Sequence, residues 1–118
     1  MTTTELQGIV RFRFHDAKSV EDFKRLSNEC MEIARTKDDG TLQYDTFFNA
    51  DETEAIVIER FRDAEALVLH GENNGHLMEA ILATGECHGE LLGDVPAELR
   101  RNFDADGPVQ LFTPWSRL

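Results

Sequence analysis

Positive charge is scarce in this sequence. Its 118 residues hold 12 lysines and arginines against 23 aspartates and glutamates, which gives a net charge of −11 at pH 7. Nucleic-acid binding depends on basic side chains that neutralise phosphates, and anionic membranes attract basic surfaces for the same reason. The composition therefore argues against nucleic acid and against a membrane surface as partners, and the acidity itself indicates solubility.

Long apolar runs, targeting signals and paired cysteines are also missing. No segment approaches the ~18 consecutive apolar residues of a membrane span, and the first residues lack the basic and apolar regions of a signal peptide. The two cysteines, Cys30 and Cys87, do not form a CxxC pair, so reduced thiols are expected. We therefore expect a cytoplasmic protein in which Cys30 is a small core residue.

Motifs for common cofactors are absent too. The chain has no GxGxxG sequence, P-loop or nucleophile elbow, and no internal repeat. No two histidines lie at metal-ligand spacing on one helix face, so no metal site is expected. The length fits one domain over residues 1–118, with a core over about 8–95 and a C-terminal extension over about 96–118.

The hydrophobic pattern predicts alternating strands and helices. Ser19 is the expected N-cap of the first helix, with Asp22 completing a near capping box, and Gly40 suits a left-handed turn after it. Asp63 is the expected cap of the next helix, which the glycines of residues 71–75 should break. The expected strands are 8–15, 42–49, 54–62, 86–95 and 109–115, and the expected helices are 20–36, 63–70, 76–83 and 96–103, the last beginning at Pro96.

This order is β-α-β-β-α-β followed by an α-β tail. It predicts an α+β protein with a ferredoxin-like split βαβ plan, in which an antiparallel sheet carries its helices on one face. The third strand is apolar on both faces, because Ile56 and Ile58 oppose Val57 and Phe61. A monomer would expose one set, so we expect a homodimer that packs sheet on sheet. Whether the last strand extends its own sheet or crosses to the partner stays open.

Two residues able to move protons lie close together in the chain. Glu59 lies on the third strand, between Val57 and Phe61, and His70 lies on the helix after it, so we interpret His70 as a general base and Glu59 as its partner. Structural alternatives remain open: His70 could cap a helix end, Glu59 could form a plain salt bridge, and His76 could be a surface residue.

Aromatic residues of the strands supply the other expected pocket residues. Tyr44 is expected to hydrogen-bond a substrate oxygen, and Phe12, Phe48 and Phe61 are expected to form aromatic walls. His76, on the segment after the glycines, completes the candidate substrate-binding set.

One segment of the chain, residues 40–81, carries a specific set of residues: Gly40 with Tyr44, Glu59-Arg60-Phe61, Ala64-Glu65-Ala66-Leu67, His70 and His76. In these residues the segment resembles the antibiotic biosynthesis monooxygenase domain, a family of dimeric α+β barrels. The resemblance covers about residues 8–95, and the sequence departs from the family pattern in having Phe61 where tryptophan is usual.

The resemblance implies several activities on one scaffold. Family members include monooxygenases that oxidise polycyclic phenols or quinols with dioxygen and no cofactor, haem-degrading enzymes, an isomerase of a phosphorylated sugar, and members without known activity. Haem degradation is not expected, because the family's first-strand asparagine is missing and the only tryptophan is Trp115. A phosphosugar site would need a basic cluster, which is not evident, although Arg11, Arg13 and Arg60 could be recruited.

Three hypotheses follow for the function. The first is a cofactor-independent monooxygenase that deprotonates a small phenolic or quinol substrate with His70. The second is a related proton-transfer enzyme, such as an isomerase, that uses the same pair of residues. The third is a dimeric small-molecule binding or stress module without catalysis. The fold alone cannot separate these, because one scaffold can host all three.

Overall fold

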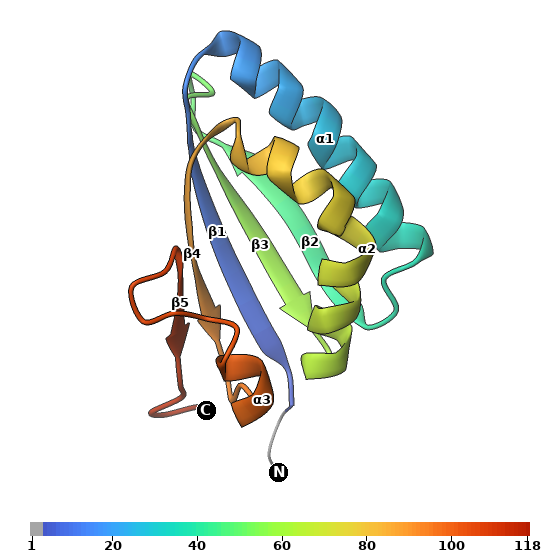
Figure 1. Cartoon of the computed structure of the whole chain (residues 1–118), viewed down its shortest axis with the longest axis vertical. Coiled ribbons are helices and arrows are strands. Elements are labelled where there is room, and N and C mark those ends of the chain that lie inside the picture. Colours follow the sequence, from blue (N-terminus) through green and yellow to red (C-terminus); the bar gives the residue numbers. More distant parts are fainter. Residues whose placement is uncertain (1–3) are drawn as a thin grey trace.

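A five-stranded sheet with two long helices on one face forms the body of the chain (Figure 1). It is described here for residues 4–118 in a computed structural model. The elements are β1 (Leu6–Phe14), α1 (Ala17–Thr36), β2 (Thr41–Phe48), β3 (Glu54–Phe61), α2 (Ala64–Leu82), β4 (Gly85–Leu92), α3 (Ala97–Arg100) and β5 (Val109–Phe112). No helix in this part of the chain is long and apolar enough to cross a membrane.

The strand order is β2-β3-β1-β4-β5. β1 lies between β3 and β4 and is antiparallel to both, and β2 is antiparallel to β3. This is the predicted ferredoxin-like α+β plan, which is confirmed. β5 pairs with β4 in parallel, so in this structure the last strand extends the chain's own sheet. It ends at Phe112 rather than at Trp115, whose side chain is fully exposed.

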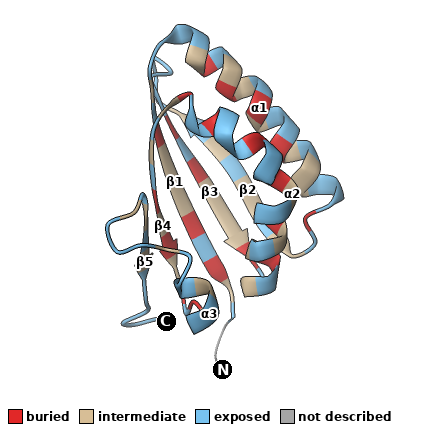
Figure 2. Cartoon of the chain, in the orientation of Figure 1, coloured by how far each residue is buried: buried red, intermediate tan, exposed pale blue. Residues whose placement is uncertain are grey.

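Buried, intermediate and exposed residues follow one another along the strands of the sheet (Figure 2), and the two faces of the sheet differ in burial. The face under α1 and α2 carries the main core, in which Phe12, Val57 and Cys30 are buried. The opposite face carries Ile56 and Phe47, which are exposed, next to Ile58. The expected division of β3 into two apolar faces is therefore present.

Helix α1 begins earlier than predicted. Its N-cap is Asp16, whose Oδ1 accepts a 2.8 Å hydrogen bond from the Ser19 backbone N–H. The predicted cap at Ser19 with Asp22 is therefore wrong. Aspartate is as good a cap as serine, and the cap satisfies a backbone donor that the first turn leaves without a partner.

Helix α2 runs without a break through Gly71 and Gly75, so the predicted interruption is wrong. Asp63 caps it as predicted, accepting from the Ala66 backbone N–H at 2.9 Å. Two glycines cost a helix only about 1 kcal/mol each, and packing of the buried side of α2 outweighs that cost. His70 lies inside this helix, which excludes the alternative that it caps a helix end.

The C-terminal helix α3 is one turn long. It covers Ala97–Arg100, with Pro96 as its N-cap rather than as its first helical residue. Leu99 and Phe103 pack against the buried residues Leu6, Leu91 and Val95, which form a second, smaller core. The C-terminal extension is thus part of the packed body of the protein.

Candidate active site

His70 is held on the buried side of α2. The side facing the sheet also contains Ala66, Asn74, Leu77 and Ile81, spaced at the three- and four-residue intervals that share one helix face. Only 8% of His70 is exposed. A polar ring at this depth needs a partner; its Nδ1 is hydrogen-bonded to one carboxyl group, and a second carboxyl group faces its Nε2.

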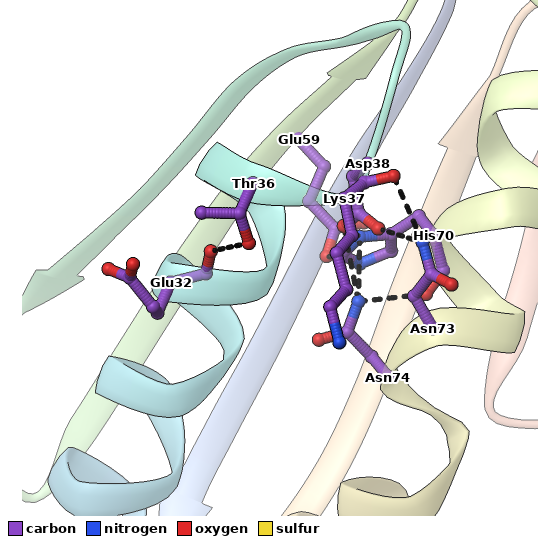
Figure 3. Close-up of polar contacts among 8 residues, drawn as sticks. All are labelled: Glu32, Thr36, Lys37, Asp38, Glu59, His70, Asn73 and Asn74. Carbon is purple, nitrogen blue, oxygen red and sulfur yellow. Dashed lines mark hydrogen bonds and ion pairs between the residues drawn. The ribbon is translucent and has the colours of Figure 1, made fainter.

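Asp38 is the partner of the first nitrogen. His70 Nδ1 lies 2.7 Å from Asp38 Oδ2, and Figure 3 shows the two side chains meeting between the α1–β2 loop and α2. Asp38 also accepts hydrogen bonds from Asn73 Nδ2 at 2.8 Å and Asn74 Nδ2 at 3.2 Å. A carboxylate only accepts, so the proton of neutral His70 is on Nδ1, and Nε2 carries the free lone pair.

The loop after α1 explains the position of Asp38. The backbone N–H groups of Lys37 and Asp38 both donate to Ile33 O, which turns the chain back towards α2. Gly40 then takes a φ of 89°, a conformation that glycine adopts without strain. A Cβ on Gly40 would lie 2.7 Å from the Ala66 side chain, so glycine is also what lets the loop approach α2.

Glu59 faces the second nitrogen. Its Oε1 lies 3.8 Å from His70 Nε2, and 15% of its side chain is exposed. Glu59 is paired in register with Gly8 of β1, and a Cβ on Gly8 would lie only 3.0 Å from Glu59 Oε2. The missing side chain at Gly8 therefore leaves room for the Glu59 carboxyl beneath His70.

Burial changes the acidity of Glu59. Loss of water around the carboxyl raises its pKa, a positive charge on the His70 ring opposes that shift when the ring is protonated, and the nearby Asp38 carboxylate adds to it. The folded protein thus holds the Glu59 proton more tightly than water does. The site places a free imidazole nitrogen beside a carboxyl that holds its proton more tightly than usual, which is an arrangement for passing protons.

Two aromatic rings flank His70. The Tyr44 ring centroid lies 5.4 Å from the His70 ring and that of Phe61 lies 5.3 Å from it. Burial raises the pKa of the Tyr44 hydroxyl, with Cys30 and Glu59 adding to the effect, so Tyr44 stays protonated. Burial likewise raises the pKa of Cys87 to about 11. The two rings that flank His70 are therefore uncharged near neutral pH.

The structure brings together only part of the predicted set. His70, Glu59, Tyr44 and Phe61 form one cluster, as described above. Phe12 and Phe48 pack instead with Phe14 and Phe23. Phe12 lies four residues along β1 from Gly8, the partner of Glu59, which is about 13 Å in a strand. His76 is exposed on α2.

The sequence analysis missed Asp38, Asn73 and Asn74. Asp38 lies two residues before Gly40, at a turn where a polar side chain is readily presented, and that position is the one local signal for it. The two asparagines lie within the segment predicted to be a break. Among residues 4–118 no group of three or more potential ligands is arranged to hold a metal ion.

The raised pKa of Glu59 gives a test of the site without a substrate. A buried acid with a raised pKa lowers stability as the pH rises above its unfolded-state pKa, because unfolding then releases its proton. We expect Glu59→Gln to increase the free energy of unfolding at pH 8 and to change it much less at pH 4. Urea unfolding at both pH values measures this, and a variant less stable than the wild type at pH 8 would contradict it.

Comparison with solved structures places the fold. No protein-family model and no curated protein matches the chain. MupZ from Pseudomonas fluorescens superposes with a TM-score of 0.81 at 22% identity, over 100% of this chain and 91% of MupZ.

Two further structures match the core. SnoaB, a cofactor-independent oxygenase from Streptomyces nogalater, matches with a TM-score of 0.66 at 14% identity, over 80% of this chain and 95% of SnoaB. An antibiotic biosynthesis monooxygenase matches with a TM-score of 0.64 at 24% identity, over 77% of this chain and 99% of the other. The chain thus has the fold of antibiotic biosynthesis monooxygenase structures, as its sequence resemblance predicted.

Proposed function

We propose that this chain is a cofactor-independent monooxygenase that acts on a small phenolic or quinol substrate. The observation that carries the proposal is the hydrogen bond between Asp38 and His70 Nδ1, which leaves Nε2 free as a base at a nearly buried position. The likeness of the fold to SnoaB, described as a cofactor-independent oxygenase, supports it. Access to Nε2 requires neighbouring side chains to move, because His70 and Glu59 are nearly buried.

The proposed chemistry begins with proton removal. Dioxygen is a triplet and reacts slowly with closed-shell molecules, but a deprotonated phenol or quinol is a much better one-electron donor. His70 Nε2 takes the proton, and the Asp38 carboxylate stabilises the imidazolium that forms. The anion passes one electron to dioxygen, and the two radicals combine into a peroxide at carbon. Loss of water leaves a carbonyl, so the substrate supplies all four electrons that reduce dioxygen.

Glu59 and Tyr44 have supporting roles in this proposal. Glu59 lies on the Nε2 side and, when protonated, is placed to return a proton as the peroxide loses water. Tyr44 stays neutral and so offers its hydroxyl to a substrate oxygen. Phe61 forms one wall of the site and helps to exclude water, which would otherwise compete for Nε2.

Isotope labelling tests the oxygenase directly. Turnover of an anthrone or quinol by metal-free, flavin-free protein under ¹⁸O₂ should place one labelled oxygen in the product carbonyl and the other in water. Label found only in hydrogen peroxide, with none in the organic product, would show an oxidase and contradict the proposal.

A second candidate is a proton-transfer enzyme such as an isomerase. The raised pKa of Glu59 favours it, because an acid next to a free base can remove a proton from one atom and return one to another. This reading predicts exchange of a substrate C–H with solvent deuterium in the absence of dioxygen, and no dependence of turnover on dioxygen.

We also propose a homodimer formed through the outer faces of the two sheets. Phe47 and Ile56 are exposed there beside Ile58, and burying them removes apolar surface from water. We expect Ile56→Asp to convert a dimer into a monomer in light scattering. Val68→Asp, which changes an exposed apolar residue on the helical side, should leave the mass unchanged. A weak dimer has a dissociation constant of roughly 100 μM. Wild-type protein that is still monomeric at that concentration would therefore contradict this proposal.

A further inference from the structure

The outward face of α2 carries an apolar stripe that nothing in residues 4–118 covers. Val68, Met78 and Leu82 are 42%, 40% and 47% exposed, and Figure 2 shows exposed segments along α2 on the side away from the sheet. Gly71 and Gly75 lie between them and are also exposed. We call these five residues the α2 stripe.

The spacing of the α2 stripe is that of a helix–helix contact. Its positions are separated by three, four, three and four residues, which is the alternation of a coiled-coil seam. At 100° per residue they fall within an arc of about 80°, and they extend over about 21 Å of helix. A stripe of this length and period is matched by another α-helix rather than by a compact small molecule.

The two glycines supply an independent indication. A Cβ at Gly71 or at Gly75 would meet no atom within 4 Å, so nothing inside residues 4–118 requires glycine there. Each costs an exposed helix about 1 kcal/mol relative to alanine. Glycines four residues apart remove the side chains that would hold a second helix at a distance, and so allow close approach of the two backbones.

The N-terminal half of the stripe opens into a hollow between α2 and α3. This hollow has a volume of about 490 Å³, and Val68, Leu69 and Leu99 are among the apolar residues that line it. Glu65, Glu72 and Glu98 line it as well, and its lining, drawn wholly from described residues, holds no lysine or arginine. The stripe is thus continuous with a recess able to receive a side chain of the docked helix.

Charge decides which helix fits. Glu65, Glu72 and Glu79 are exposed and follow one another at seven-residue intervals beside the stripe. Two copies of α2 packed together would bring the carboxylates of one copy near those of the other, in a chain of net charge −11. Repulsion between these like charges makes such a pairing unfavourable. A helix with an apolar seam and flanking lysines or arginines would pair with them instead.

We propose that the α2 stripe is a docking surface for a basic amphipathic helix of a partner protein. The surface lies on the helical side of the sheet, opposite to the face assigned to the homodimer. Docking and dimerisation are therefore compatible, and a dimer would present two such surfaces. The proposal does not depend on the reaction at His70.

A designed peptide tests the proposal on the full chain. The probe is a fluorescent helical peptide of three heptads with leucine at the seam positions and lysine beside them; its matched control carries glutamate in place of each lysine. We expect saturable binding of the lysine peptide only, weakened by added salt. Amide chemical-shift changes in ¹⁵N-labelled protein should centre on residues 65–82.

Two variants that add the same side chain distinguish peptide binding at the α2 stripe from unspecific electrostatic attraction of the peptide to an acidic protein. Gly75→Leu fills the centre of the stripe and raises helix propensity, so the fold is kept while peptide affinity should fall at least tenfold. Ala80→Leu adds the same side chain to α2 outside the stripe and should leave affinity within twofold.

Three results would overturn the proposal. They are no binding of the lysine peptide at millimolar concentration, equal affinity for Gly75→Leu and wild type, and a loss of oligomeric mass in Gly75→Leu. The last result would make a second copy of the chain the occupant of the stripe.

Discussion

Replacing His70 with alanine should reduce kcat/KM at least 100-fold. General-base catalysis by a placed side chain contributes about 10²- to 10⁴-fold, and no other free imidazole lies near Glu59 among the described residues. The expected loss lies in kcat, because a base acts on the transition state more than on the bound substrate. Product formation from a quinol, followed by its absorbance, measures the effect.

The fold of the variant has to be kept for this result to count. His70 is buried and hydrogen-bonded to Asp38, so its removal leaves a polar group with fewer partners. His70→Gln is the second variant, because its amide can still donate to Asp38 but cannot accept a proton. His15→Ala, which removes an exposed histidine from the β1–α1 junction, is the control and should keep full activity. Comparable rates in His70→Gln and wild type would rule out His70 as the base.

Replacing Asp38 with asparagine should lower kcat by about 10²- to 10⁴-fold while KM changes little. In the proposed mechanism Asp38 is a positioning residue: its carboxylate accepts from His70 Nδ1 and holds the tautomer with Nε2 free. An amide in the same place presents an N–H group to Nδ1, which moves the histidine proton to Nε2. In serine proteases the corresponding change lowers kcat about 10⁴-fold.

A spectroscopic measurement separates this role from a purely structural one. ¹⁵N spectra of the His70 ring should show the Nδ1–H tautomer in the wild type and the Nε2–H tautomer in Asp38→Asn, with similar thermal melting of the two proteins. Asp39→Asn, the same change at an exposed neighbour, should alter neither tautomer nor rate. Full activity of Asp38→Asn would show that Asp38 does not position His70 for catalysis.

Much of the fold followed from local pattern. Alternation in β1 and the division of β3 into two apolar faces identified the sheet, and Asp63 identified the start of α2. The errors lie where two local signals compete. Asp16 and Ser19 are both good caps, and only the hydrogen bond from Ser19 N to Asp16 shows which one acts.

The break predicted at Gly71–Gly75 failed for a different reason. Glycine lowers helix propensity, but Asn74 is 1% exposed and its side chain donates to His70 O at 2.8 Å. Tertiary packing of the side of α2 that carries Asn74 therefore outweighs the low helix propensity of the glycines on the other side. The exposed glycines that misled the prediction are the ones that the α2 stripe explains.

The candidate site was predicted only where its residues lie close in the chain. Glu59 and His70 are eleven positions apart, and Tyr44 is paired with Glu59 across β2 and β3. The predicted hairpin and the helix that follows it are therefore enough to bring these three residues close together. Asp38 lies 32 residues from His70, and no local pattern links the two. Phe12 and Phe48 share the helical side of the sheet with His70. Alternation of apolar residues predicts the face on which a side chain lies but not how far along the strand it lies from His70.

The most direct test of the central claim is oxygen consumption by metal-free, flavin-free protein with a panel of quinols and anthrones. Wild type, His70→Ala and Glu59→Gln are measured side by side against the uncatalysed rate. We predict uptake by the wild type with at least one substrate, and loss of that uptake in His70→Ala. Uptake that survives in His70→Ala, or a wild type no faster than buffer with every substrate, would contradict an oxygenase built on His70.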